Sequence, residues 1–103
     1  MTEEGKVKEG VKKIMKRYAP YVYYHMPVQN GMGLPTLDFV GCAGGHFFAI
    51  ETKAPGKKPT PRQSLTAKQM CEAGGMTFVI DGSISDFDAL SSWIEKVIGE
   101  TAP

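Results

Sequence analysis

Two consecutive glycines, Gly44 and Gly45, separate two largely apolar stretches at residues 37–42 and 46–53. A Gly-Gly pair favours a two-residue β-hairpin turn, because glycine adopts positive φ without steric cost. If these glycines form the whole loop, the pairing of the two strands follows by counting, and the numbers of opposed residues sum to 89. The glycine pair thus predicts both an antiparallel hairpin and its register.

The predicted register brings three charged residues to one face of the sheet. Asp38 lies opposite Glu51, and directly opposed residues project to the same face. Lys53 shares that face, because it follows Glu51 by two positions and side chains alternate along a strand. Glu-x-Lys also occurs on solvated strand edges, and an aspartate also caps turns. The apolar run at residues 47–50 indicates a buried strand, however, and charges at the end of a buried strand favour a functional role.

Two opposed carboxylates destabilise a hairpin, so we expect a cation between them. Hard divalent ions such as Mg²⁺ bind through one or two carboxylates and keep water ligands on the substrate side. Asp38 and Glu51 are therefore predicted to bind the metal. Lys53 would hold or deprotonate an attacking water, while the ion neutralises charge at a phosphate.

The patterns outside the hairpin predict helices and further strands. Capping boxes formed by Thr60 with Gln63 and by Ser85 with Asp88 open two helices, and Gly99 follows the last one. The predicted helices span residues 3–18, 61–73 and 85–98, and the predicted strands span 21–26, 37–42, 46–53 and 76–80. This order, α-β-β-β-α-β-α, predicts a single α/β domain over residues 1–103 in which helices flank a central mixed sheet.

The charged residues are distributed unevenly along the chain. Residues 1–68 contain 11 lysines and arginines against 5 acidic residues, whereas residues 69–103 contain 1 against 6. A basic part beside an acidic part suits a protein that orients itself on a polyanion such as nucleic acid. An ordinary solvated surface would explain the same charges.

Several classes of protein are disfavoured by the sequence. No apolar run approaches the roughly 18 residues of a membrane span, and the charged N-terminus lacks the apolar core of a signal peptide, so we expect a cytoplasmic protein. Neither a Walker loop nor GxGxxG is present, which disfavours a nucleotide cofactor. Cys42 and Cys71 have no CxxC spacing, so we expect buried free thiols rather than a disulfide framework or a zinc site.

Three short motifs stand in order at residues 34–38 (LPTLD), 50–53 (IETK) and 60–63 (TPRQ). Together they resemble the VRR-NUC family of small, often phage-borne nucleases in the PD-(D/E)xK superfamily. The resemblance implies a restriction-endonuclease-like α-β-β-β-α-β core, here with an extra C-terminal helix. It also implies hydrolysis of phosphodiester bonds that depends on Mg²⁺ or Mn²⁺. A phage-encoded member would act in the host cytoplasm.

The resemblance also assigns roles to further residues. It implies that the backbone carbonyl of Thr52 is a metal ligand and that Gln63 assists catalysis from the following helix. The acidic N-terminal ligand of the family best matches Glu4, with Glu9 as the weaker match. A capping box explains Gln63 without catalysis, and the helix dipole explains Glu4 without a metal.

The sequence departs from the family pattern at two places. Leu37 precedes Asp38 where the family has proline, which should change little because the carboxylate carries the chemistry. Residues 76–81 contain no Val-Arg-Arg, the motif that names the family. Its absence removes one expected phosphate contact and leaves the path of the DNA open.

Polar residues near the predicted site suggest contacts to nucleic acid. Lys57, Lys58 and Arg62 flank the site in sequence and suit phosphate contacts, although a solvated loop would also contain them. Gln29 and Asn30 precede the Asp38 strand and are candidates for contacts to backbone or bases. Turn formation also explains Asn30, because glycine follows it.

These observations predict a metal-dependent nuclease that hydrolyses phosphodiester bonds in DNA. Branched, flapped or junction DNA is the substrate that the resemblance implies, and a homodimer would supply the second active site for cutting both strands. Two alternatives stay open. A non-catalytic nucleic-acid-binding module would use Asp38, Glu51 and Lys53 as an ion-pair cluster, and a nuclease subunit would be active only with a partner protein.

Overall fold

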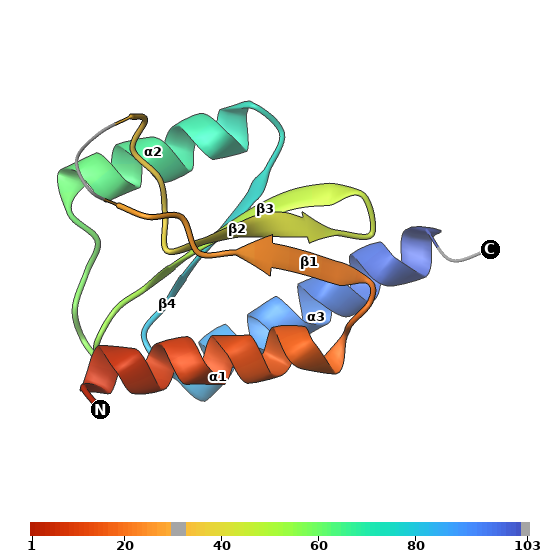
Figure 1. Cartoon of the computed structure of the whole chain (residues 1–103), viewed down its shortest axis with the longest axis horizontal. Coiled ribbons are helices and arrows are strands. Elements are labelled where there is room, and N and C mark those ends of the chain that lie inside the picture. The colour runs from red at the N-terminus through yellow and green to blue at the C-terminus, as the bar shows by residue number, and fades with distance from the viewer. Residues whose placement is uncertain (30–32, 102–103) are drawn as a thin grey trace.

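The computed structural model describes residues 1–29 and 33–101, which form a four-stranded sheet flanked by helices (Figure 1). Strands β1 to β3 pair antiparallel in chain order, and β4 pairs parallel with β3, so the sheet is mixed as predicted. The elements are α1 (Glu3–Arg17), β1 (Val22–His25), β2 (Phe39–Ala43), β3 (His46–Thr52), α2 (Pro61–Glu72), β4 (Met76–Ile80) and α3 (Ile84–Thr101). The predicted order of elements is confirmed.

The hairpin of β2 and β3 has the predicted register. Ala43 pairs with His46 and Phe39 pairs with Ile50. The turn between the strands contains Gly45 at φ 84°, a backbone conformation that favours glycine. Asp38 lies one residue before β2 and is therefore outside the paired ladder. Its position follows from the register, but the pleat of the paired strands does not direct its side chain.

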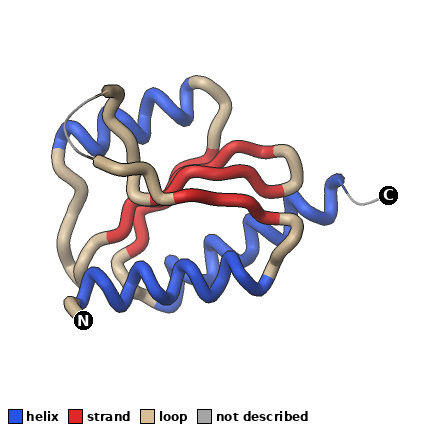
Figure 2. The backbone as a smooth tube through the Cα atoms, in the orientation of Figure 1, coloured by secondary structure: helices blue, strands red, loops and turns tan. Residues whose placement is uncertain are grey.

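The helices cover the two faces of the sheet unequally (Figure 2). Helices α1 and α3 lie together on one face, and α2 lies on the other. Alternation along β3 sends Phe48 and Ile50 into the core with α1 and α3, so Glu51 projects toward α2. The hydrophobic core consists of the buried residues Val7, Val11, Ile14, Met15, Val22, Phe39, Ala43, Phe48, Ile50, Phe78, Ile80, Leu90, Ile94 and Val97. The core therefore lies on the face opposite to Glu51.

Helix α3 differs from the sequence-based expectation at both of its ends. The hydroxyl of Ser83, not that of Ser85, accepts a hydrogen bond from the Asp86 backbone N–H (3.2 Å) at the start of α3. The Ser-x-x-Asp pattern occurs twice in succession, and the first copy forms the cap. Helix α3 also continues through Gly99 to Thr101.

The two cysteines are exposed rather than buried. Cys42 pairs across the sheet with Tyr23 and Phe47, which are themselves 72% and 44% exposed, so this part of the sheet face is open to solvent. Cys71 lies on α2 within 3.1 Å of the Thr77 hydroxyl. Within the two described ranges, no helix is both long and apolar enough to cross a membrane.

Candidate active site

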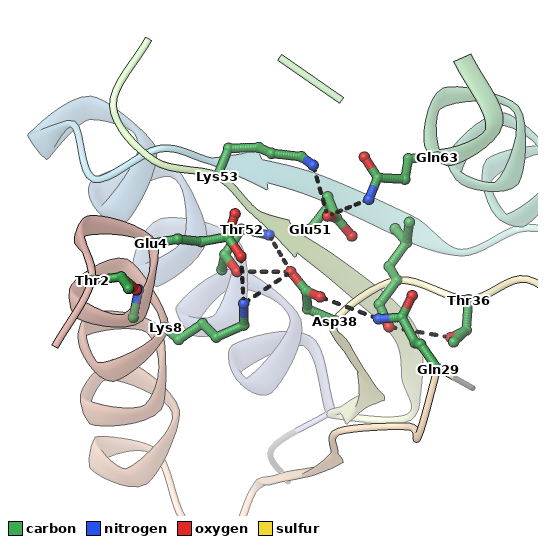
Figure 3. A network of polar contacts seen from close by, with 12 residues as sticks. Thr2, Glu4, Lys8, Gln29, Thr36, Asp38, Glu51, Thr52, Lys53 and Gln63 are labelled. Atoms are coloured by element: carbon green, nitrogen blue, oxygen red, sulfur yellow. Dashed lines mark hydrogen bonds and ion pairs between the residues drawn. The ribbon is translucent and has the colours of Figure 1, made fainter. Parts of the chain in front are cut away.

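Glu51 occupies the centre of the site at the end of β3, and it is only 3% exposed. The Lys53 ammonium lies 3.5 Å from Glu51 Oε2. Gln63, in the first turn of α2, donates a hydrogen bond from Nε2 to the same oxygen (2.9 Å). Figure 3 shows Lys53 and Gln63 converging on Glu51 from two elements. The expected contact between the glutamate and the lysine of Glu-x-Lys is therefore present.

Both carboxylate oxygens of Asp38 accept hydrogen bonds. Its Oδ2 accepts from the Thr52 backbone N–H (2.9 Å) and from the Thr52 hydroxyl (2.7 Å). Its Oδ1 accepts from Nε2 of Gln29 (3.2 Å). These bonds fix the Asp38 carboxylate across the end of β3, beside Glu51. Gln29, expected as a nucleic-acid contact, thus touches the carboxylate cluster itself.

Helix α1 adds a lysine that sequence reasoning missed. Lys8 Nζ lies 2.8 Å from Glu4 Oε2 and 3.8 Å from Asp38 Oδ2. Burial lowers the pKa of Lys8, but the hydrogen bond from Lys8 to Glu4 and the negative charges of Asp38, Glu4 and Glu51 outweigh it and raise the pKa above 10.5. The ion pair of Glu4 and Lys8 could have been predicted from the sequence, because residues four apart are neighbours on a helix. The contact between Lys8 and Asp38 could not, because it depends on how α1 docks on the sheet.

The pKa of Glu51 is raised to about 7. Burial of the carboxylate is the largest cause and the charge of Asp38 is the next, while the Lys53 ammonium opposes both. Within the described part of the chain, Glu51 Oε1 is a buried side-chain oxygen without a hydrogen-bond partner. A buried, unpartnered carboxylate oxygen is costly, so a group that binds it would relieve a real penalty.

A hard divalent cation fits this donor set. No cluster of three or more His, Cys, Asp or Glu side chains suited to a metal occurs within residues 1–29 and 33–101. Mg²⁺ does not need one, because it binds through one or two carboxylates and keeps several waters. Asp38 and Glu51 provide two carboxylates, and Glu51 Oε1 has a free lone pair. The residues present therefore fit Mg²⁺ or Mn²⁺.

The other predicted residues differ in whether they contact this cluster. Glu4 reaches it through Lys8, and the role of Thr52 seen here is hydrogen bonding to Asp38. Arg62 lies on α2 next to Gln63 and is exposed. Lys57 and Lys58 are exposed in the loop after β3, and Asn30 lies outside the described residues.

The fold matches that of a known domain. A search of solved structures finds a chain described as "VRR_NUC domain" with a TM-score of 0.73 and 20% sequence identity. The match covers 89% of this chain and 97% of that chain. No protein-family model matches the sequence, and no curated protein matches it. The chain therefore has the fold of a VRR_NUC domain, and the predicted α/β architecture with its C-terminal helix is confirmed.

Proposed function

We propose that this protein is a metal-dependent nuclease of the VRR-NUC type that hydrolyses phosphodiester bonds in DNA. The observation that carries the proposal is the buried Glu51 carboxylate with its unpartnered Oε1, next to Asp38 and in contact with Lys53. An ion-pair cluster of purely structural purpose would satisfy this oxygen. The fold shared with a VRR_NUC domain supports the same conclusion.

The residues of the cluster have separable roles in this reaction. Asp38 and Glu51 would hold Mg²⁺ or Mn²⁺, with the Thr52 carbonyl and Glu4 as further candidate ligands. The bound ion supplies charge neutralisation at the phosphate and a more acidic water. Lys53 lies where its ammonium can orient the attacking water or exchange a proton with it. Gln63 holds Glu51 Oε2 through its amide, which leaves Oε1 free for the ion.

Charges around the site favour a polyanionic substrate. Lys57, Lys58 and Arg62 are exposed near the site, on the loop after β3 and the first turn of α2, and suit phosphate contacts. The lysine-rich face of α1 adds to the same field. One such site cuts one strand, so we further propose that two copies of the chain associate to cut both strands of a duplex or junction.

The test is a cleavage assay with a matched pair of controls. Linear, flapped and four-way-junction DNA are incubated with the protein in Mg²⁺, Mn²⁺ or EDTA. Glu51→Ala and Lys53→Ala should abolish metal-dependent cutting. Glu72→Ala and Lys68→Ala remove a chemically equivalent but exposed pair, 3.9 Å apart on α2, and should retain cutting.

The same variants separate the nuclease from the two alternatives. A Mn²⁺ titration should detect a site that Glu51→Ala loses and Glu72→Ala keeps. Cutting that persists in Glu51→Ala would refute the assignment of the site. If the folded protein binds DNA but never cuts it, the non-catalytic binding module or the partner-dependent subunit becomes the better interpretation.

A further inference from the structure

A pocket of about 250 Å³ opens directly beside the carboxylate cluster. It lies between the segment that leads into β2 and the first turns of α2. Gln29 and Gln63 line it, and these are the two residues whose amides donate to Asp38 and Glu51. Figure 3 shows both glutamines on the side of the carboxylates opposite to Lys8. A ligand in the pocket would therefore lie one side chain away from both predicted metal ligands.

The lining of this pocket combines apolar walls with a few polar groups. Val28, Leu34 and Pro35 form the apolar part, and Thr36 and Arg62 contribute a hydroxyl and a guanidinium. Leu34 is 92% exposed and Val28 is 83% exposed, so neither is used for packing within the described chain. An apolar wall with a few hydrogen-bonding groups is the usual composition of a site for a small organic group.

The size and charge of the pocket narrow the class of ligand. Its volume lies below the roughly 300–1,000 Å³ typical of drug-sized ligands, so it suits a single planar ring system. Unstacked bases bind between apolar side chains and Arg planes, with hydrogen bonds to their edges. The Arg62 guanidinium also suits the phosphate attached to such a base.

We propose that this pocket binds one unpaired base of the substrate strand, next to the phosphate that is cut. This inference rests on the proposed nuclease function and specifies how one nucleotide of the substrate is held. A base inside a duplex would have to leave its stack to enter, at a cost that is smallest for bases already unpaired. Cutting should therefore depend on the presence of a base at one particular position beside the cut.

The experiment combines abasic DNA substrates with a substitution of Leu34, an apolar residue that lines the pocket. Flapped DNA is prepared with a single abasic nucleotide at each position around the cut, and the cleavage rate is measured with the natural protein. One abasic position should slow cutting about tenfold, the size expected for loss of one stacked base. Leu34→Ala should reduce that penalty to about twofold. Leu65→Ala removes an exposed leucine of α2 outside the pocket and should keep the full penalty.

A second measurement does not depend on cutting. Isotope-labelled protein in EDTA is titrated with deoxyadenosine monophosphate, and with deoxyribose 5-phosphate as the base-free control. Amide shifts should appear with the nucleotide only, and should weaken in Leu34→Ala, at the pocket residues Gly33, Leu34, Thr36, Thr60, Arg62 and Gln63. Shifts that are equal for both ligands would show a phosphate site and overturn the base-binding proposal.

The outcomes distinguish failure of the pocket from failure of the nuclease proposal. Robust cutting with equal rates at every abasic position refutes base binding and leaves the nuclease intact. Absence of cutting with every DNA refutes the nuclease, and the nucleotide titration then decides alone. In that case, amide shifts at the pocket that require the base support base binding, and the absence of such shifts at millimolar nucleotide refutes it.

Discussion

Replacement of Glu51 by glutamine should stabilise the metal-free protein above neutral pH. Burial and Asp38 raise the pKa of Glu51 from 4.5 to about 7. The folded state therefore holds this proton more tightly than the unfolded state, so stability is full below about pH 4.5 and falls as the pH rises through about 7. A shift of this size corresponds to a loss on the order of 3 kcal/mol, at about 1.36 kcal/mol per pKa unit. Glu51→Gln removes this loss, because an amide has no charge to bury.

The assay is urea unfolding in EDTA between pH 4.5 and 8 for the natural protein, Glu51→Gln and the exposed control Glu72→Gln. The free energy of unfolding should fall more steeply with pH in the natural protein and in Glu72→Gln than in Glu51→Gln. At pH 8 the Glu51→Gln variant should be more stable by up to about 3 kcal/mol, equivalent to a melting temperature raised by roughly 10 °C or more. Mn²⁺ should stabilise the natural protein but not Glu51→Gln. Parallel pH curves for all three proteins would refute the account of Glu51 as a buried charge that requires a cation.

Three further changes test other parts of the structure. Lys53→Met should lower the cleavage rate at least about 100-fold while Mn²⁺ binding, measured by calorimetry, persists. Loss of Mn²⁺ binding in this variant would assign Lys53 to the metal site instead. Gln63→Ala should lose about 1 kcal/mol of stability in denaturation and most of the cutting. Gln63→Glu can still complete the capping box, but it should recover neither, because its carboxylate cannot donate to Glu51 and would repel it; recovery of both would contradict the contact between Gln63 and Glu51. Gly41→Ala should cost about 1–3 kcal/mol in the same denaturation assay, because its Cβ would meet the Tyr23 carbonyl oxygen and Tyr24 Cα, and a neutral result would contradict the packing of β1 on β2.

The local part of the fold was predictable because local chemistry determines it. The pair Gly44-Gly45 can form a tight turn at positive φ, and that turn sets the register from Ala43↔His46 to Phe39↔Ile50. Helix spacing and caps likewise act over three or four residues. Alternation along the strand placed Glu51 and Lys53 on one face, and the structure has the Lys53 ammonium 3.5 Å from Glu51 Oε2.

The contacts of Asp38 could not be predicted, because they depend on tertiary packing. Counting places Asp38 across from Glu51, but its carboxylate is hydrogen-bonded to Thr52 and Gln29. The ladder ends at Phe39, so the pleat does not direct the Asp38 side chain. Lys8 reaches the same carboxylate from α1, across a helix-sheet interface that no sequence pattern specifies.

Gln63 shows why a structural and a functional explanation of one residue need not compete. Its Oε1 accepts from the Thr60 backbone N–H (2.9 Å), which completes the capping box, and its Nε2 donates to Glu51 (2.9 Å). The cap uses only the acceptor end of the amide, so it leaves the donor end free and fixes its direction. The capping motif therefore positions the group that holds Glu51. Because both interpretations predict glutamine at this position, only the docking of α2 against β3 reveals that one amide makes the capping contact and also reaches Glu51.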